Sequence, residues 1–186
     1  MTDDSSGSGA NRAVPVLSGP DAPLFRHVLG HYPTGVAVVT AMTSDGPVGL
    51  SINSFTSVSL EPPLVLFCPA LSSSTWPLVR DAGSIAINVL SAEQESVSRL
   101  FAARVADRFA DIDWVPGTNN APLLVDALGW LECSVQAEHP AGDHTVVIAG
   151  IDRMGVHEQI GEPLAYFRGS YYRGITEAVE SADDER

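Results

Sequence analysis

The spacing of apolar and polar positions predicts a chain of strands with a few short helices between them. Apolar and β-branched runs typical of buried strands alternate with turns rich in Gly, Pro, Asn and Ser. The run at residues 64–68 has no polar position, so we expect it to be buried on both sides. Strands are predicted at residues 36–41, 48–54, 64–68, 84–89, 128–137, 145–156 and 163–167.

Helical spacing and capping residues predict three short helices. Apolar residues within 24–30 share one face of a helix that ends near its final glycine. A hydroxyl cluster before the Trp-Pro pair predicts a second helix over residues 76–83. Ser91 and Gln94 have capping-box spacing and open a third helix, whose inner face carries the apolar residues of 97–101.

These elements favour an antiparallel architecture. Asp45-Gly46 lies between two predicted strands and is a strong hairpin signal, because both residue types tolerate positive φ. Strands and helices do not alternate regularly, which argues against a Rossmann-type parallel sheet. An antiparallel barrel with peripheral helices fits the pattern better. The sequence contains no internal repeat, no glycine-rich phosphate loop and no hydrolase motif.

Length and composition indicate one globular domain with two tails. The chain has 186 residues, of which 45% are hydrophobic. The first residues are rich in Ser, Gly, Asp and Pro without any periodicity, and the last ones are acidic. We therefore expect a disordered leader at residues 1–23, a folded domain at residues 24–176 and an acidic disordered tail at residues 177–186.

The charge of the chain limits its partners and its compartment. The net charge is -13, and all ten basic residues are arginines, which argues against nucleic acid and anionic membranes as partners. No apolar run is long enough to cross a bilayer and no signal peptide is recognisable, so we expect a cytoplasmic protein. Cys68 and Cys133 stand alone in apolar surroundings, which indicates buried free thiols.

The segment at residues 49–65 begins like a strand and then becomes too polar for ordinary core. Ser51, Asn53 and Ser57 bring hydroxyls and an amide among apolar anchors. The prolines at 62–63 end the segment, because neither has an N–H to donate. Two interpretations stay open: a wall that holds a flat ligand with polar edges, or a Ser/Thr-rich edge strand with a bulge.

The hydroxyl cluster at residues 72–75 has more donors than a helix cap needs. One hydroxyl suffices for capping, so the surplus favours an anion site such as a phosphate site at the start of the helix. Arg108 is a candidate for the fixed positive charge of such a site. The alternative for Arg108 is an exposed side chain that pairs with Asp107 or Asp111.

His144 follows Gly142-Asp143 at the head of a predicted strand, and its surroundings look more arranged than those of the other four histidines. The alternative is a turn residue that bonds back to the chain. The spacing of the histidines predicts no metal site. No serine or cysteine stands in a recognisable nucleophile context, so acyl transfer is not supported.

Short motifs run through the chain in a fixed order. They are Pro33-Thr34-Gly35-Val36, Val48-Gly49, Asn53-Ser54-Phe55, Ser57-Val58-Ser59-Leu60, Pro62-Pro63-Leu64-Val65, Ser72-x-Ser74-Thr75, Asn88-Val89-Leu90-Ser91, Phe101-Ala102, Arg108-Phe109, Gly142-Asp143-His144 and Tyr166-x-x-Gly169-x-Tyr171. This series resembles the short-chain flavin reductases, the NAD(P)H-dependent partners of two-component flavin monooxygenases. The similarity covers about residues 24–173. Each motif is loose, but their joint order is specific.

The resemblance implies an FMN-binding split β-barrel, mainly β with short helices, antiparallel and of Greek-key type, and usually a homodimer. By resemblance, one polar wall would line the isoalloxazine edge, and the hydroxyl cluster with Arg108 would meet the phosphate. The cofactor-binding residues implied are Thr34, Ser51, Ile52, Asn53, Ser54, Ser57, Ser72, Ser73, Ser74, Thr75, Arg108, Phe109 and Tyr171. His144 is the candidate catalytic residue and, with Tyr171, would border the nicotinamide.

By resemblance, the expected activity is that of an NAD(P)H-dependent flavin reductase that supplies reduced FMN or FAD, held non-covalently, to a separate monooxygenase. NADH is expected rather than NADPH, since no cluster of basic residues is evident for a 2′-phosphate. Two alternatives stay open: a flavin carrier or sensor of the same fold, and a flavoprotein that oxidises its own substrate. The motifs do not discriminate FMN from FAD.

Overall fold

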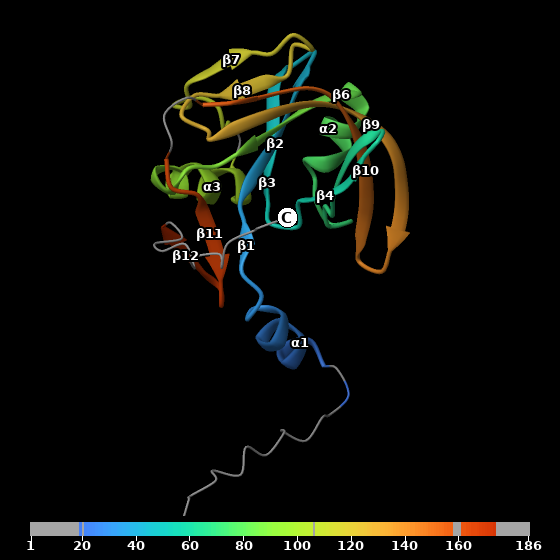
Figure 1. Cartoon of the computed structure of the whole chain (residues 1–186), viewed down its shortest axis with the longest axis vertical. Coiled ribbons are helices and arrows are strands. Elements are labelled where there is room, and N and C mark those ends of the chain that lie inside the picture. Colours follow the sequence, from blue (N-terminus) through green and yellow to red (C-terminus); the bar gives the residue numbers. More distant parts are fainter. Residues whose placement is uncertain (1–18, 20, 106, 158–160, 174–186) are drawn as a thin grey trace, which may run out of the picture.

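The structure, a computed structural model, describes residues 19, 21–105, 107–157 and 161–173 (Figure 1). The helices are α1 (Ala22–Leu29), α2 (Trp76–Ala82) and α3 (Glu95–Ala102), and a 3-10 turn, η1 (Ala92–Gln94), leads into α3. The strands are β1 (Thr34–Gly35), β2 (Ala37–Thr43), β3 (Gly46–Ile52), β4 (Thr56–Leu60), β5 (Pro63–Phe67), β6 (Ser84–Val89), β7 (Trp114–Pro116), β8 (Pro122–Leu124), β9 (Gly129–Ala141), β10 (His144–Val156), β11 (Leu164–Phe167) and β12 (Ser170–Arg173).

Seven strands form one antiparallel sheet in the order β3-β2-β6-β9-β10-β5-β4, and two smaller sheets are β1-β11-β12 and β7-β8. The turn between β2 and β3 consists of Ser44 and Asp45, one residue earlier than the Asp45-Gly46 pair suggested, and Gly46 opens β3 opposite Thr43. Gly46 has φ 120°, and the Thr43 hydroxyl donates to the Gly46 carbonyl at 2.8 Å. Glycine adopts this φ without strain. The predicted hairpin and the predicted mainly-β, antiparallel fold class are both confirmed.

Strand β2 is buried on both faces, because two apolar clusters lie on its opposite sides. Val39 belongs to the cluster around Trp76 of α2, to which β3, β5, β6, β9 and β10 also contribute. Its neighbour Val38 belongs to a second cluster, with Phe101 of α3 and Phe109. Since strands near both ends of the sheet meet in the first cluster, the sheet curls around α2 (Figure 1).

The strand prediction was too simple in two respects. The described residues contain twelve strands where six or seven were expected. The strands β1, β4, β7, β8 and β12 were missed, because each has only two to five residues and lacks a long apolar run. The expectation that residues 64–68 are buried on both sides was wrong. Leu64 and Leu66 are half-buried, while Val65 and Phe67 face the core, since β5 lies next to the edge strand β4.

The helices follow their predicted ends closely. Asp21 caps α1 by accepting the N–H of Leu24 at 2.7 Å, so α1 begins two residues before the expected boundary at residue 24. The predicted end at Gly30 and the capping box of η1 are confirmed. The cap of α2 comes from Ser73, which accepts the N–H of Trp76 at 3.1 Å. Residues 1–18 and 20 of the expected leader lie outside the described residues, as does the acidic tail.

Helix α1 stands apart from the curled sheet (Figure 1). None of its residues is buried. Phe25, Val28 and Leu29 each expose more than half of their surface. Among the described helices, none has both the length and the apolar character to span a membrane.

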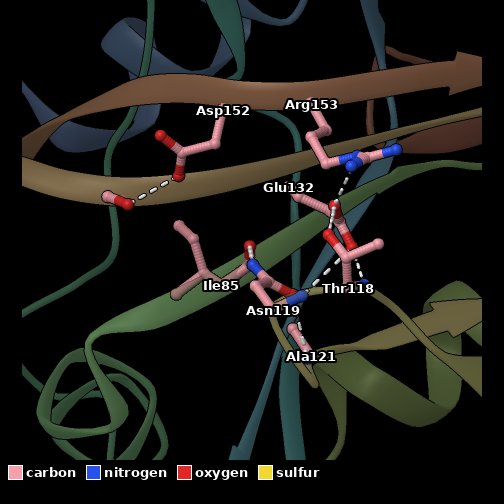
Figure 2. A network of polar contacts seen from close by, with 8 residues as sticks. Ile85, Thr118, Asn119, Ala121, Glu132, Asp152 and Arg153 are labelled. Atoms are coloured by element: carbon pink, nitrogen blue, oxygen red, sulfur yellow. Dashed lines mark hydrogen bonds and ion pairs between the residues drawn. The ribbon is translucent and has the colours of Figure 1, made fainter.

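Glu132 on β9 carries a buried carboxylate that holds the β7–β8 hairpin against the sheet (Figure 2). It accepts hydrogen bonds from the backbone N–H and the hydroxyl of Thr118 and from the N–H of Asn119, and Arg153 Nε lies 3.7 Å away. A Cβ on Gly117 would collide with this carboxylate. Burial by itself raises the pKa of Glu132, but these hydrogen bonds and the Arg153 charge lower it below its ordinary value.

Candidate functional site

A cavity of about 340 Å³ opens where the end of β3, the start of β10 and the segment before α2 meet α3 and the residues that follow it. This first cavity is lined by Leu50, Ser51, Ile52, Asn53, Ser54, Cys68, Pro69, Ala70, Ser72, Ser73, Ser74, Thr75, Phe101, Ala102, Arg104, Arg108 and His144. Ten of the fourteen residues predicted for the site are therefore brought together here.

The wall formed by residues 51–54 combines a buried anchor with polar groups that reach the cavity. Ile52 is buried in the core beside α2, which fixes the end of β3. Ser54 ties the wall to the end of β5, because its hydroxyl accepts the N–H of Cys68 at 2.8 Å. Asn53 is exposed at the cavity and makes no hydrogen bond among the described side chains. The polar-wall interpretation thus fits residues 51–54.

The guanidinium group of Arg108 contacts the hydroxyl cluster at residues 72–75. Its guanidinium donates to Thr75 Oγ1 at 3.0 Å and to the carbonyl of Ala103 at 2.6 Å. In the described residues it makes no ion pair, and Asp107 instead accepts the N–H of Phe109 at 2.9 Å. The alternative of an arginine neutralised by Asp107 or Asp111 is therefore not what the structure contains, and the charge of Arg108 lies at the cavity.

Ser72 and Ser74 line the same cavity, and neither makes a side-chain hydrogen bond within the described residues. Arg104, four residues before Arg108, also lines it. Arg104 was not predicted from the sequence. The signal that could have found it is its spacing of four residues from Arg108, just after the end of α3. Two guanidinium groups and several hydroxyls at one place form an arrangement suited to phosphate oxygens.

His144 reaches the cavity because β10 begins beside the segment that precedes α2. It forms a bridge with Ala70, and the N–H of Leu71 donates to the Asp143 carbonyl at 2.9 Å. His144 Nδ1 lies 2.7 Å from Asp143 Oδ1, and its side chain is 44% exposed. Hydrogen bonding and charge from His144 lower the pKa of the Asp143 carboxyl. A carboxylate only accepts, so Nδ1 carries the proton and Nε2 is left for a ligand.

Tyr171 lies on the other side of the wall, in a smaller adjoining cavity that shares Ser51, Ile52 and Asn53. Its hydroxyl is 2.9 Å from Ser98 Oγ, which is 2.9 Å from Ser51 Oγ. Ser98 is fully buried on α3 and connects the two sides of the wall. Sequence reasoning missed Ser98, because nothing near it in the chain distinguishes it from an ordinary helical serine.

The remaining predicted residues lie outside the first cavity. Ser57 is exposed on β4, at the edge of the sheet opposite to β3, beside a register shift between Ser57 and Ser59. For Ser57 the bulged edge strand is thus what the structure contains. Thr34 on β1 has a buried Oγ1 without a hydrogen-bond partner among the described residues. Phe109 packs edge-on against Phe101 and borders a second cavity.

The two cysteines are free, but they differ in burial. Burial raises the pKa of the Cys133 thiol to about 12, with the carboxylates of Asp152 and Glu132 adding to the effect. The prediction of a buried thiol is confirmed for Cys133 and wrong for Cys68, which is half-buried at the end of β5 and lines the first cavity. Within the described part of the chain, no three His, Cys, Asp or Glu side chains gather as metal ligands do.

Comparison with known proteins decides the family. A model of the flavin reductase like domain matches residues 29–174. The chain belongs to the flavin reductase family. The resemblance found from the motifs is confirmed.

Several proteins of known name are similar to this flavin reductase domain. It is 42% identical over 163 residues to the FMN reductase (NADH) SmoA of Agrobacterium fabrum, with 88% of this chain and 92% of the relative covered. It is 39% identical over 152 residues to the flavin-dependent monooxygenase reductase subunit HsaB of Mycobacterium tuberculosis, with 81% of each covered. The expected enzyme class, a flavin oxidoreductase, is confirmed by these relatives.

The fold of this flavin reductase domain also matches solved structures. The NADH:FAD oxidoreductase SgcE6 of Streptomyces globisporus, in complex with NAD and FAD fragments, superposes with a TM-score of 0.80 at 34% identity. The match covers 91% of this chain and 100% of that one.

Proposed function

We propose that this chain is an NADH-dependent flavin reductase that supplies reduced FMN or FAD to a separate monooxygenase in the cytoplasm. The observation that carries the proposal is the pairing, in one cavity, of a neutral polar wall at residues 51–54 with hydroxyls and the Arg108 cation. A flavin has the matching chemistry, because its ring is flat with polar edges and its tail ends in a phosphate. The names of the relatives point to the same activity.

The residues present fit a non-covalently bound flavin. Asn53, Ser72 and Ser74 have side-chain groups that are not committed to other described side chains. Arg108 supplies a charge that pairs with no carboxylate in the described part of the chain. These hydrogen-bond donors and this positive charge are already in place before a ligand arrives. They therefore favour the binding of a ligand with an anionic tail.

Hydride acceptance from the nicotinamide is the chemistry that a bound flavin supplies. The chain's own groups have a positional role. The wall orients the ring, the hydroxyl cluster fixes the tail, and we assign His144 at the first cavity and Tyr171 at the adjoining one to the nicotinamide. Hydride transfer requires two rings in contact at a fixed angle, so positioning alone carries much of the rate.

NADH is proposed rather than NADPH. The cations at the first cavity, Arg104 and Arg108, adjoin the hydroxyl cluster that we assign to the flavin phosphate. The neighbouring surface is acidic, with Asp45, Asp81 and Asp107 around a further cavity. A 2′-phosphate would be repelled there.

Two partners are proposed: a second copy of the chain and a monooxygenase component that binds transiently. The exposed apolar side of α1, with Phe25, Val28 and Leu29, is the kind of surface that an interface covers. The relative HsaB is named a reductase subunit of a flavin-dependent monooxygenase. A reductase that releases reduced flavin needs a separate oxygenase to use that flavin.

The test of the proposed activity is NADH oxidation, followed by absorbance at about 340 nm, with and without added free flavin. We expect turnover that rises with free flavin and saturates, because flavin is a substrate that enters and leaves. A protein that binds flavin but does not oxidise NADH would be a carrier or sensor. Turnover that requires an organic substrate would indicate a flavoprotein with its own oxidation chemistry.

Replacing Arg108 with glutamine is expected to weaken FMN binding about ten- to thirtyfold, since a hydrogen-bonded charge on a phosphate has that order of effect. Riboflavin has no phosphate, so its affinity should change less than twofold. Fluorescence titration measures both. Arg108→Lys should retain part of the FMN affinity, and Arg80→Gln, at an exposed arginine paired with Asp81, is the matched control. Equal weakening of both flavins would contradict the phosphate assignment.

A further inference from the structure

Three hydroxyl groups connect the first cavity with the smaller cavity that adjoins it. Ser51 lines both cavities, whereas Ser98 and Tyr171 line the smaller one, whose volume is about 200 Å³. Ser98 Oγ lies 2.9 Å from Ser51 Oγ and 2.9 Å from the hydroxyl oxygen of Tyr171. We call Ser51, Ser98 and Tyr171 the hydroxyl relay, because each hydroxyl is within hydrogen-bond distance of the next.

The oxygen atoms of the hydroxyl relay are held in place by three different elements. Ser51 belongs to β3, and Ser98 is fully buried on α3. The ring of Tyr171 on β12 packs edge-on against Tyr166, with the ring centroids 5.2 Å apart, and the guanidinium carbon of Arg99 lies 4.7 Å from its centroid. Packing therefore fixes the three oxygens, and the orientation of their protons is what can change.

The protons of the hydroxyl relay have two consistent arrangements, because a hydroxyl donates one proton and accepts through its lone pairs. Ser98 is fully buried, and Ser51 and Tyr171 are its only side-chain partners among the described residues, so its proton points to one of them while the other donates to it. When Ser98 donates to Ser51, the Ser51 proton is available to a ligand and Tyr171 offers only lone pairs. When Ser98 donates to Tyr171, these roles are exchanged. Only one end of the hydroxyl relay can therefore donate to a ligand at a time.

We propose that Ser98 is a positioning residue through which a flavin ring at Ser51 determines how Tyr171 meets the nicotinamide. This inference rests on the proposed function, because it takes the flavin ring to lie at residues 51–54 and the nicotinamide to lie at Tyr171. The polar edge of an oxidised flavin ring consists mainly of acceptors, carbonyl oxygens and ring nitrogens, which attract the Ser51 proton. Tyr171 then accepts, which suits the N–H groups of the nicotinamide carboxamide and rejects a carboxylate at the same place.

The inference is tested by fluorescence titration of riboflavin in saturating NAD+ and in saturating nicotinic acid adenine dinucleotide. These dinucleotides differ only in the amide or carboxylate of one ring, and neither reduces the flavin, so the readout is binding and not turnover. Coupling between two ligands is reciprocal, so the riboflavin dissociation constant reports the orientation of the hydroxyl relay. In the unmodified protein we expect this constant to be about three- to tenfold higher with the acid than with NAD+, the order of one hydrogen bond.

Ser98→Ala removes the middle hydroxyl and keeps a good helix former. The two riboflavin dissociation constants should then agree within twofold. Tyr171→Phe removes the end of the hydroxyl relay while it keeps the aromatic ring, and it should give the same result. Ser96→Ala is the matched control and should retain the difference, because Ser96 is exposed on the same helix and lines none of the described cavities.

A role of Ser98 in packing alone predicts a lower melting temperature for Ser98→Ala with the three- to tenfold difference intact. A difference that persists in either folded variant, Ser98→Ala or Tyr171→Phe, would therefore overturn the inference. Equal riboflavin dissociation constants with the two dinucleotides in the unmodified protein would also overturn it and leave the proposed function standing. A protein that binds no flavin at all would overturn the proposed function itself.

Discussion

Replacing His144 with alanine is expected to lower kcat/KM for NADH ten- to hundredfold while the flavin dissociation constant changes less than twofold. The imidazole lines the first cavity, and its Nδ1–H is occupied by Asp143 at 2.7 Å. Nε2 is therefore the group available to the nicotinamide. An imidazole at this place orients the hydride donor but supplies no hydride, so the loss should appear mainly in KM.

The competing interpretation of His144 is that it closes the turn between β9 and β10. That role predicts a lower melting temperature and unchanged kinetic constants for the protein that stays folded. His139→Ala is the matched control, since His139 is exposed on the same hairpin and lines none of the described cavities. Steady-state NADH kinetics and thermal melting of both variants decide the question. His144→Gln should recover part of the activity, because its amide nitrogen reaches about as far as Nε2.

Replacing Glu132 with glutamine is expected to lower the free energy of unfolding by about 2–4 kcal/mol, because one of its two buried accepting oxygens becomes an NH2 group that faces other donors, and the negative charge is lost. The carboxylate accepts from Thr118 and Asn119 and holds the β7–β8 hairpin against the sheet (Figure 2). For a domain of this size the melting temperature should fall by about 4–16 °C. NADH oxidation at a temperature where the variant is folded should stay within twofold, since Glu132 lines none of the described cavities.

The effect of Glu132 should depend on pH in a defined direction. The folded pKa lies below the ordinary value of 4.5. The stabilisation is therefore fully present above that value, and it is lost as the pH falls through the folded pKa. The difference in unfolding free energy between the unmodified protein and Glu132→Gln should be largest above about pH 5 and should shrink in more acidic solution.

Urea unfolding at a series of pH values measures this difference. Glu61→Gln is the control, because Glu61 is exposed in the turn between β4 and β5 and its carboxylate makes no contact with a described side chain. A Glu132→Gln variant as stable as the control at neutral pH would show that the Thr118 and Asn119 bonds contribute no net stability.

The sequence by itself determined the local features of this protein. The β2–β3 hairpin, the end of α1 at Gly30 and the capping box at Ser91 each depend on residues within a few positions of one another. Such signals reflect backbone preferences that act before the fold forms. The order of the loose motifs identified the family, which the match over residues 29–174 confirms.

The tertiary structure alone decided which polar residues share a cavity. Ser98 lies 47 positions from Ser51, and only the packing of α3 against β3 brings their hydroxyls together. Ser57 follows Ser51 closely in the chain, yet β3 and β4 are opposite edges of the sheet, so Ser57 is placed elsewhere.

Charged residues show the same division between local and long-range information. The sequence around Glu132 resembles an apolar strand and does not indicate which residues pair with the carboxylate. The 117–121 turn reaches Glu132 only because of the order of the strands in the folded chain. Arg108 has acidic neighbours in sequence but bonds to Thr75, 33 positions away. Turn and cap signals are read from neighbouring residues, whereas the partner of a charge depends on strand order and on the space left after the core has packed.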